Sequence, residues 1–429
     1  MSVRVLLLGA GGREHALACK LAQSPRLPQL FAMPGNPGLA QVAQCLTGNP
    51  LHFEHVASQI RSLAIDYVLI GPEKPLADGI VNYLEAQDLP SLKGIIGPRQ
   101  QGAMLESSKT FSKQFMLEYG IPTASARFFE ANELPAAIDF ARLRGGRIVV
   151  KADGLAAGKG VVVSSTVAEA EAAINSMLAD RVLGQAGERI LLEEVMEGIE
   201  CSCFVLVGGN TFTLLPTAKD YKRIGDGDTG PNTGGMGSVS PVPFADDAFE
   251  DLVVERIVKP SLHGLKQRGI AYKGILFIGL MVLNGEPKVI EYNVRLGDPE
   301  TQSIMLRLQD DLLGLIEDCI HDRLNNGRAG VLPHAACTIV MCASGYPGHF
   351  TRGLPIGLPK ALMPGCHIFH AGTALDASAS LTSAGGRILN ISATAPTLTQ
   401  ARQRAYEQLA QINYPDRYYR FDIGMDVLD

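Results

Sequence analysis

The first hundred residues repeat one pattern of polar and apolar positions, in which an apolar run ends at a glycine-bearing turn. Such turns begin at Gly9, Gly71 and Gly97, and longer mixed stretches follow the first two of them. Apolar runs without alternation are typical of strands that are buried on both faces of a parallel sheet. The pattern therefore predicts a parallel α/β domain over residues 1–103.

Residues 104–326 predict a second, larger α/β unit that opens with a helix. Apolar positions recur with helical spacing over residues 106–119, where Lys109 and Lys113 lie one turn apart. Most lysines on helices are solvated, and that is the simplest interpretation of this pair. A small α/β subdomain is then expected over about residues 123–192.

A glycine-rich stretch between two β-branched runs, at residues 148–163, predicts strand, loop and strand within this subdomain. Glycines let the backbone turn N-H groups onto a charged ligand, and Lys151 and Lys159 add positive charge at the two ends of the loop. The expected ligand is a polyphosphate. A P-loop is excluded because Asp153 holds the first glycine slot and a strand follows. A Gly/Ala-rich surface hairpin is the alternative.

An Asn-Gly pair at residues 284–285, between two apolar runs, predicts a β-hairpin. On its second strand the period of two places four side chains on one face, namely Val289, Glu291, Asn293 and Arg295. Glu291 and Asn293 are oxygen ligands spaced about 6 to 7 Å apart along the strand. They can therefore share a magnesium ion whose coordination is completed by phosphates. Polarity on an exposed sheet face is the alternative.

The last hundred residues predict an α+β domain over residues 327–429. Apolar runs predict strands at residues 335–343, 367–370 and 387–393, and Thr397 begins a Thr-x-x-Gln cap of a helix. No pattern in this region is typical of catalysis. Four histidines lack metal-ligand spacing and are expected to pack or to face solvent: His334, His349, His367 and His370.

Composition and charge exclude several classes of protein. The net charge of −6, without any lysine or arginine run longer than two residues, argues against nucleic acid as a partner. No apolar run approaches the length of about 18 residues that a membrane span needs, and no signal peptide is present, so we expect a cytoplasmic protein. Eight cysteines without a C-x-x-C pair make disulfides and structural zinc unexpected. The expected partners are small metabolites.

The turn after the first strand begins like a dinucleotide-binding unit but breaks the glycine fingerprint. Glu14 occupies the third glycine slot, and no acidic residue follows the second strand. The helix N-terminus at Gly11 and Gly12 can still bind one phosphate or carboxylate of a substrate. Asn36 and Glu73 also follow strand ends, where ligands bind in such sheets, so the four residues are expected to line one crevice. Tight-turn geometry alone is the alternative.

A strand that ends at Glu193, Glu194 and Val195 is the candidate for binding a nucleotide base. Backbone N-H and C=O groups at such an end suit an adenine edge, and a nearby carboxylate suits two ribose hydroxyls. Glu200, at the start of the following strand, is the ribose candidate. A solvated glutamate at a sheet edge is the alternative.

Residues 220–237 combine six glycines with charged side chains and show no hydrophobic period. Structureless loops longer than about 12 to 15 residues are uncommon unless they are functional or disordered. The mixture of acidic and basic residues, which includes Asp220 and Lys222, is typical of a loop that wraps an anionic, amine-bearing substrate. A flexible linker is the alternative.

The chain resembles the phosphoribosylamine-glycine ligase family of ATP-grasp enzymes in three segments, KADGLAAGKG, DYKRIGDGDTGPNTGGMG and EYNVRLGDPETQ. The first segment alone indicates only an ATP-grasp enzyme, whereas the other two single out this ligase. The match runs nearly end to end. It implies an α/β protein with an ATP-grasp fold, built from an N-terminal parallel α/β pre-ATP-grasp domain, a small lid subdomain and a C-terminal α+β domain.

The resemblance also implies roles for individual residues. ATP would contact Lys109, Lys151, Gly158, Lys159, Gly160, Glu193, Glu194, Val195 and Glu200. Glycine and the phosphoribosyl group would contact Gly11, Gly12, Asn36, Glu73, Thr233, Gly234, Gly235 and Asp298. Arg295, Asp220 and Lys222 would be the catalytic residues. Glu291 and Asn293 would bind the metal ion, which is Mg²⁺ or, alternatively, Mn²⁺.

The implied reaction is the ATP-dependent joining of glycine to 5-phosphoribosylamine through glycyl phosphate, a step of de novo purine biosynthesis. A monomer or a weak homodimer is expected. Three alternatives remain. Another ATP-grasp carboxylate-amine ligase would lack the TGPNTGGMG loop, and an ATP-binding regulatory module would not need the paired metal ligands and lysines. A dinucleotide-dependent oxidoreductase is disfavoured by the broken glycine fingerprint.

Overall fold

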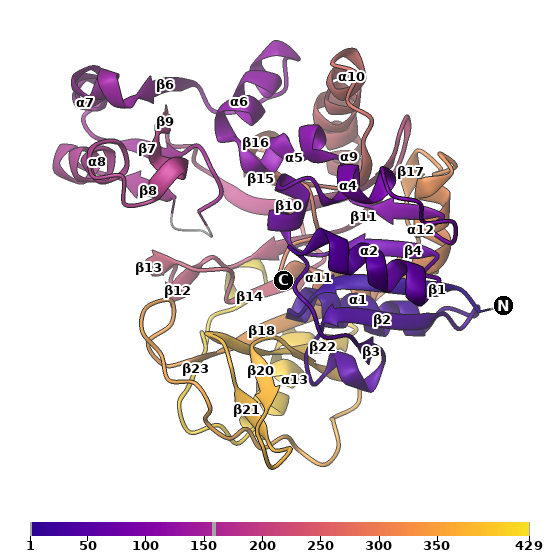
Figure 1. The fold of residues 1–429 in the computed structure, drawn as a ribbon. Coiled ribbons are helices and arrows are strands. Elements are labelled where there is room, and N and C mark those ends of the chain that lie inside the picture. The colour runs from indigo at the N-terminus through magenta and orange to yellow at the C-terminus, as the bar shows by residue number, and fades with distance from the viewer. Residues whose placement is uncertain (1, 157–159, 429) are drawn as a thin grey trace.

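The computed structural model describes residues 2–156 and 160–428. The chain forms an N-terminal parallel sheet, a small four-stranded subdomain and a long mixed sheet (Figure 1). In Figure 1 the small subdomain, which carries β6–β9, projects from the rest of the molecule. The expectation of an ATP-grasp fold with an N-terminal parallel domain is confirmed by the comparisons given below.

The N-terminal sheet is parallel, as predicted, with strand order β3-β2-β1-β4-β5. Leu6 and Leu8 of the central strand pack in one apolar core, whereas Val5 and Leu7 pack in another on the opposite face. This double burial explains the unbroken apolar run. The elements are β1 (Arg4–Gly9), α1 (Gly12–Ala22), β2 (Gln29–Pro34), β3 (Gln44–Cys45), α2 (Phe53–Ser62), β4 (Tyr67–Ile70), α3 (Glu73–Ala77), α4 (Ile80–Glu85) and β5 (Gly94–Ile96).

The single helix predicted over residues 106–119 is wrong, because the structure has two helices there. They are α5 (Gln100–Ser107) and α6 (Lys109–Glu118). Ser108 separates them in an extended conformation, and its hydroxyl accepts a hydrogen bond from the Phe111 N-H. Serine is a favoured N-cap residue, since its side chain replaces a backbone partner at the start of a helix.

The predicted strand, glycine-rich loop and strand are present in the small subdomain, which we call the lid. Its antiparallel sheet has the order β6-β9-β7-β8 and is covered by α7 and α8. The Thr166 hydroxyl accepts a hydrogen bond from the Glu169 N-H and caps α8. Gly158 and Lys159, two of the predicted phosphate ligands, lie outside the described residues. The elements are β6 (Ala126–Glu130), α7 (Leu134–Leu143), β7 (Ile148–Ala152), β8 (Val161–Ser164), α8 (Val167–Ile174) and β9 (Arg189–Glu193).

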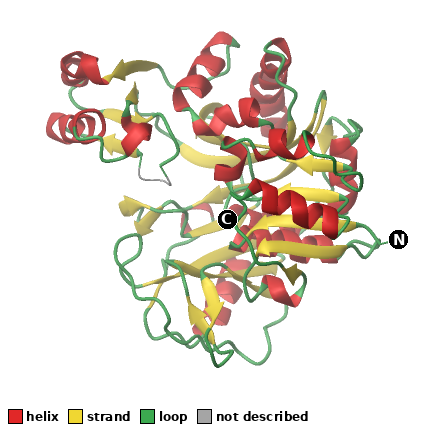
Figure 2. Ribbon diagram, viewed as in Figure 1, coloured by secondary structure: helices red, strands yellow, loops and turns green. Residues whose placement is uncertain are grey.

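The long sheet extends from the middle of the chain into the C-terminal region, in the order β16-β15-β10-β11-β14-β18-β22-β19. Figure 2 draws all strands of the protein in yellow. The strands of the long sheet are β10 (Ile199–Gly208), β11 (Thr211–Asp220), β14 (Gly237–Ser240), β15 (Lys273–Leu283), β16 (Glu286–Asn293), β18 (Ala335–Ala343), β19 (Cys366–His370) and β22 (Arg387–Ala395). Two short strands, β17 (Gly327–Arg328) and β23 (Arg417–Tyr418), pair with β11 and β18.

Further helices lie along the chain between and after these strands. They are α9 (Asp247–Val253), α10 (Lys259–Gln267), α11 (Glu300–Arg307), α12 (Leu312–Ile320) and α13 (Leu398–Ala410). A π-helical turn (Val254–Val258) joins α9 to α10. The predicted cap at Thr397 opens α13. No helix within the described ranges is both long enough and apolar enough to cross a bilayer. All eight cysteines are free thiols, as expected.

The expectation that residues 220–237 form a structureless loop is wrong. The segment contains a β-hairpin of β12 (Arg223–Gly225) and β13 (Thr229–Asn232), and its two ends continue β11 and lead into β14. Gly227 and Asp228 form the turn with positive φ angles of 67° and 53°. The short strands carry glycine and charged residues, so they lack the alternation that would have predicted them.

The prediction that Val289 shares a face with Glu291 is also wrong. The register with β15 shifts at residues 279–280, so β16 carries one unpaired residue, Ile290, and forms a β-bulge. One extra residue moves every following side chain to the other face of the strand. Val289 therefore lies in the apolar core. The other three side chains of the predicted face stay together.

Candidate active site

A buried carboxylate between two lysines forms one wall of the site. Glu193, at the end of β9, contacts Lys113 Nζ of α6 at 3.1 Å and Lys151 Nζ of β7 at 2.7 Å. All three side chains are almost completely buried. Burial lowers the pKa of Lys113, and Glu193 opposes that shift. Two cations on one anion leave a net positive charge, which favours an anionic ligand beside Lys151.

Lys113 was missed by sequence analysis, which treated it as a solvated helix residue. The lysine also donates hydrogen bonds to the Thr123 hydroxyl and to the Ala124 carbonyl. The one signal in the sequence was its position one turn after Lys109, since residues four apart share a helix face. That spacing does not distinguish a solvated lysine from a buried one.

The glycine-rich flap is tied to the N-terminus of α6. The Asp153 carboxylate accepts hydrogen bonds from the Ser108 hydroxyl and from the Thr110 N-H, and the Asp153 carbonyl accepts one from the Lys109 N-H. A carboxylate at this end is stabilised by the helix dipole. This contact sets Lys109 beside the flap. At the far end of the flap, the Gly160 carbonyl accepts a hydrogen bond from Ala152.

The predicted base-binding segment is only partly open for a ligand. Glu193 is paired on both sides, with β6 and β7, so its backbone lies inside the sheet. Glu194 exchanges hydrogen bonds with Ser125 through both its N-H and its carboxylate. The Val195 N-H and C=O have no hydrogen-bond partner among the described residues. Val195 is therefore the best placed of the three to present backbone groups to a base.

Glu200, the predicted ribose ligand, contacts a charged neighbour. Its carboxylate accepts a hydrogen bond from Lys222 Nζ, which also lies 3.3 Å from Asp220 Oδ1. Burial opposes the charge on Lys222, but Asp220 and Glu200 together hold its pKa well above the usual value. One cation therefore links the predicted ribose residue to the predicted catalytic residues.

Glu291 lies where the predicted cations converge. Burial by itself would raise the pKa of this carboxyl, but the charges of Lys222, Lys109 and Lys151 together hold it below its usual value. The Glu291 carboxylate makes no hydrogen bond or ion pair with any other described residue. A half-buried, unpaired anion among cations is thus available for a positively charged ligand.

Glu291 and Asn293 fit the predicted magnesium ion. They supply one carboxylate and one amide oxygen, and the Asn293 oxygen accepts only a long bond of 3.3 Å from Arg295. Within residues 2–156 and 160–428, no three His, Cys, Asp or Glu side chains form a metal-binding group. Mg²⁺ is often bound by one or two protein oxygens, with phosphates and waters completing the octahedron. The donor set therefore suits a metal that arrives with a polyphosphate.

Arg295 is held by acidic side chains from two other elements. Its Nη2 lies 2.9 Å from Glu106 Oε1 of α5, and its Nε lies 3.5 Å from Glu73 Oε2 of α3. Glu106 also accepts a hydrogen bond from the Val294 N-H. The predicted residues Glu73 and Arg295, far apart in the sequence, are thus brought together. Sequence analysis missed Glu106, because nothing local distinguishes it from other helix glutamates.

A second buried acid, Glu300, lies at the start of α11 near Asp220 and Lys222. Burial raises the pKa of Glu300 to about 7, and the charge of Asp220 adds to the rise. Burial likewise raises the pKa of Asp220, although Lys222 opposes that shift. The two carboxyls therefore hold protons more tightly than solvated acids do.

The raised pKa of Glu300 leads to a prediction for stability. Between its ordinary value of 4.5 and about 7, the folded protein holds a proton that the unfolded chain has lost. The free energy of unfolding contributed by this group should therefore fall as the pH rises through that window. The free energy of unfolding of Glu300→Gln should therefore increase relative to that of the wild type as the pH rises from about 5 to about 8.

Urea denaturation across this pH range measures the effect. Glu54→Gln, which changes an exposed glutamate of α2, is the matched control and should run parallel to the wild type. A Glu300→Gln curve that also runs parallel to the wild type would contradict the prediction.

The N-terminus of α1, predicted to bind a substrate anion, already contacts two carboxylates. The Gly11 N-H donates to Glu14 Oε2 at 2.6 Å, and the Arg13 N-H donates to Asp298 Oδ2 at 3.2 Å. Glu14 packs so closely on Gly71 that a Cβ atom there would lie 1.9 Å from its oxygen. The residue that breaks the glycine fingerprint thus fills the position where that fingerprint would admit a phosphate.

Asn36 and Gly12 hold the C-terminal region against the first domain. The Asn36 amide donates to the Ala10 and His370 carbonyls at 2.8 and 2.9 Å. A Cβ atom on Gly12 would lie 2.0 Å from the Asn390 side chain, so only glycine fits there. His370, expected to be a packing or surface residue, is indeed buried. Both predicted substrate residues therefore make interdomain contacts.

Arg387 joins the remaining predicted substrate residues, and sequence analysis missed it. Its Nη1 donates to the Gly234 carbonyl at 2.5 Å and to the Asp298 carbonyl at 2.7 Å. The Gly234 N-H donates to the Tyr346 hydroxyl, and the Gly235 N-H donates to the Thr233 hydroxyl. Arg387 lies about 150 residues after these glycines, so no local pattern could have linked them.

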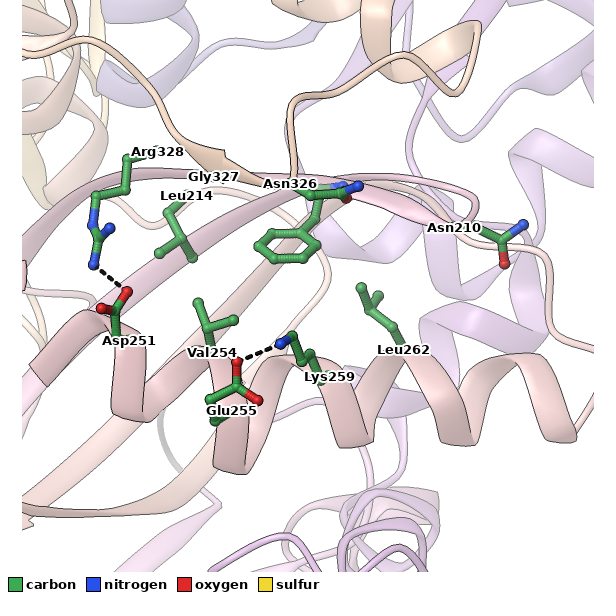
Figure 3. A pocket seen from close by; sticks show the side chains of 11 residues that line it. Asn210, Leu214, Asp251, Val254, Glu255, Lys259, Leu262, Asn326, Gly327 and Arg328 are labelled. Atoms are coloured by element: carbon green, nitrogen blue, oxygen red, sulfur yellow. Dashed lines mark hydrogen bonds and ion pairs between the residues drawn. The ribbon is translucent and has the colours of Figure 1, made fainter. Parts of the chain in front are cut away.

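A cavity of about 520 Å³ lies elsewhere (Figure 3). In Figure 3 the apolar side chains of Leu214, Val254 and Leu262 face it, and dashed lines mark the ion pairs of Asp251 with Arg328 and of Glu255 with Lys259. None of the predicted site residues lines it. Its charged side chains pair with each other, as Asp251 does with Arg328, so nothing there selects a ligand.

Three family models match successive parts of the chain. The model described as phosphoribosylglycinamide synthetase, N domain, matches residues 3–106. The ATP-grasp (A) domain model of the same description matches residues 107–301, and the C domain model matches residues 336–426.

Complete proteins and solved structures agree with these matches. A phosphoribosylamine–glycine ligase of Rhizobium meliloti is 43% identical over 422 residues, which cover 98% of each chain. The crystal structure of a phosphoribosylamine–glycine ligase from Thermotoga maritima superposes with a TM-score of 0.85 and 32% identity, over 98% of this chain and 100% of that one.

A more distant structure shares the fold alone. The biotin carboxylase domain of a 2-oxoglutarate carboxylase from Hydrogenobacter thermophilus, crystallised with MgADP and bicarbonate, has a TM-score of 0.70 and 18% identity. The alignment covers 97% of this chain and 91% of that domain.

Proposed function

The chain belongs to the phosphoribosylglycinamide synthetase, or phosphoribosylamine–glycine ligase, family, and from that premise we propose how its residues carry out the reaction. The enzyme joins glycine to 5-phosphoribosylamine and releases glycinamide ribonucleotide, ADP and phosphate, in de novo purine biosynthesis. One observation supports the site assignment most strongly: the charges of Lys109, Lys151 and Lys222, from three separate segments, converge on the half-buried Glu291.

ATP binds between the lid and the long sheet. Val195 presents backbone groups to the adenine. Glu200 accepts hydrogen bonds from the ribose hydroxyls, and Lys109 and Lys151 bind the phosphates. Glu193 supports this arrangement by holding Lys151 in place. From their place in the glycine-rich sequence, Gly158, Lys159 and Gly160 are assigned to phosphate binding.

Glu291 and Asn293 would hold Mg²⁺, or alternatively Mn²⁺, against the phosphates. When bound, this ion supplies Lewis-acid polarisation and charge neutralisation at the transferred phosphoryl group. Arg295 adds a fixed positive charge beside them, and it is oriented by Glu106 and Glu73.

The chemistry proceeds in two displacements. First, a carboxylate oxygen of glycine attacks the γ-phosphorus, and the bond from that phosphorus to the bridging oxygen breaks, which gives glycyl phosphate and ADP. Second, the amine of 5-phosphoribosylamine attacks the acyl carbon, and the bond from that carbon to the phosphate oxygen breaks as the amine loses a proton. A carboxylate attacks a polyanion slowly unless charge is neutralised, so Lys222 and Arg295 contribute most to the first step.

The substrates bind on the side of the site formed by the N-terminal and C-terminal domains. Asp220 lines it from the end of β11, Lys222 and Thr233–Gly235 line it from the residues that flank the β12–β13 hairpin, and Asp298 lines it from the segment after β16. Gly11, Gly12, Asn36 and Glu73 complete it from the first domain. Holding both reactants together and excluding water from an acyl phosphate accounts for much of the catalysis.

We propose the same division of the chain as the sequence predicts, with domains at residues 1–103, 104–326 and 327–429 and a lid at about residues 123–192. The separate four-stranded sheet supports the proposal of a distinct lid. A cytoplasmic location and a monomeric or weakly dimeric state stay predictions.

Phosphate release tests this proposal directly. With Mg-ATP and glycine, release should require 5-phosphoribosylamine, made in place from ribose 5-phosphate and ammonia, and the amide product should accumulate in equal amount. Equal release without phosphoribosylamine would contradict the proposal, as would release that requires a different acid and amine.

A further inference from the structure

The segment of residues 417–428, which we call the C-terminal strap, contacts the β12–β13 hairpin along its length. We propose that Arg420 and Asp422 of this strap are positioning residues, which hold the hairpin so that Lys222 and Thr233 can bind the two substrates other than ATP. The inference rests on the proposed function of Lys222 and Thr233. It goes further by assigning a role to a region where the sequence showed no pattern typical of catalysis.

Arg420 is the centre of the contact. Its side chain is only 1% exposed, and its Nε and Nη2 donate to the two oxygens of Asp422 at 2.8 and 2.7 Å. Its Nη1 donates to Asp228 Oδ1 at 2.7 Å and to the Arg223 carbonyl at 3.1 Å. A bidentate guanidinium–carboxylate pair has a defined geometry. The pair therefore fixes the turn and the first strand of the hairpin at the same time.

Three further hydrogen bonds hold the same part of the hairpin. The Gly227 N-H donates to Asp422 Oδ2 at 2.8 Å, and the Phe421 N-H donates to Asp226 Oδ1 at 2.9 Å. The Tyr418 hydroxyl donates to the Ile224 carbonyl at 2.8 Å. The strap and the turn thus exchange hydrogen bonds in both directions.

The strap is itself firmly anchored, so it can impose a position on the hairpin. From α13, the Tyr406 hydroxyl donates to the Arg420 carbonyl at 2.7 Å, and Arg402 Nε donates to the Ile423 carbonyl at 2.8 Å. Ile423 is fully buried in the core of the C-terminal region. The Asp426 carboxylate accepts a hydrogen bond from the Tyr221 hydroxyl at 2.6 Å.

The opposite end of the hairpin carries the substrate residues. The Thr233 N-H and hydroxyl donate to the Lys222 carbonyl at 2.8 and 2.9 Å, and this contact closes the hairpin. Two-stranded hairpins are marginally stable on their own in water. The orientation of Lys222 toward Asp220 and Glu200 therefore depends on tertiary contacts, and at the turn of the hairpin these come from the strap.

Carboxylate-to-amide variants test the inference with little change in volume. Asp422→Asn weakens the pair with Arg420. Asp228→Asn weakens the other ion pair of Arg420 at a side chain that is 59% exposed, so this second variant should fold even if the first folds poorly. Each should raise the KM for glycine and for phosphoribosylamine by about tenfold and should also lower kcat, because Lys222 contributes to the first step as well, while the KM for ATP changes less than about twofold.

Asp376→Asn is the matched control. Asp376 is an exposed acid of the same domain that also caps a turn, where it accepts hydrogen bonds from Ser378 and Ser380, but it lies outside the strap. Its kinetic constants should equal those of the wild type. A rise in the KM for ATP equal to that for the other substrates, in either strap variant, would overturn the inference, because it would indicate a general structural defect.

Lys222→Ala, measured in parallel, separates this inference from the proposed function. If Lys222→Ala raises the KM for glycine or phosphoribosylamine while both strap variants behave like the wild type, the strap has no positioning role. If Lys222→Ala itself leaves both KM values and kcat unchanged, the proposed function of Lys222 is wrong, and the strap inference fails with it.

Discussion

Glu291→Gln is expected to lower kcat by about a hundredfold or more, with the fold intact. The glutamine keeps the size of the side chain but loses the charge that faces Lys222, Lys109 and Lys151. The loss should be largest in the phosphoryl-transfer step, because Glu291 is one of only two proposed protein ligands for the metal. Phosphate release under saturating Mg-ATP, glycine and phosphoribosylamine measures it.

ADP binding provides a second measurement for this variant, independent of turnover. In the wild type, magnesium should strengthen ADP binding, whereas in Glu291→Gln most of that increment should disappear. Metal-free ADP should bind to Glu291→Gln at least as tightly as it binds to the wild type, since an anion has been removed from beside the phosphates. Titration calorimetry with and without magnesium distinguishes these outcomes.

Glu286→Gln is the control for Glu291→Gln. It lies on the same strand, but its carboxylate is exposed and pairs with Arg256 at the surface. Turnover and metal-dependent ADP binding should both stay at wild-type values. Retention of turnover in Glu291→Gln would refute the assignment of the metal site.

The second large effect is expected on stability. Glu193→Gln should lower the free energy of unfolding by about 3 to 5 kcal/mol, because it leaves two buried lysine charges without their partner. Glu193 is 3% exposed and contacts Lys113 and Lys151 from two different elements. Urea denaturation at neutral pH measures the change.

Glu130→Gln is the matched control in the same lid sheet. Its carboxylate pairs with Arg189 on the neighbouring strand, and both side chains are largely exposed. Exposed pairs of this kind contribute about 0 to 1 kcal/mol. A Glu193→Gln variant no less stable than Glu130→Gln would show that the triad does not hold the lid to α6.

The two lysine–glutamate arrangements also differ in what they leave for the ligand. At Glu193 one carboxylate serves two lysines, so a net positive charge remains for phosphates. At Glu291 the carboxylate is free of direct partners among the described residues and is available to a metal. Adjacent sites of opposite sign suit a metal–triphosphate complex, since each part meets its complement.

Local patterns alone predicted the elements whose cause is local. The two strands around the flap, the Asn-Gly hairpin and the cap at Thr397 are all present. The parallel N-terminal sheet followed from apolar runs without alternation. In each case the residues that determine the element are neighbours in the chain, so propensity and period carry the information.

Local patterns failed where partners far away in the sequence determine the structure. The bulge at Ile290 reversed the face of Val289, because the register with β15 is decided by packing across the pair. The β12–β13 hairpin has few apolar residues and is held instead by Arg420, nearly two hundred residues later.

The amino-acid sequence by itself determined the fold class, the family and the segments that carry the chemistry, because each depends on residues close together in the chain. The tertiary structure alone decided which charges meet: Lys113 with Glu193, Arg387 with Asp298, and Arg420 with the hairpin. Such pairs form only when domains pack, and the charge of an isolated side chain does not specify its distant partner.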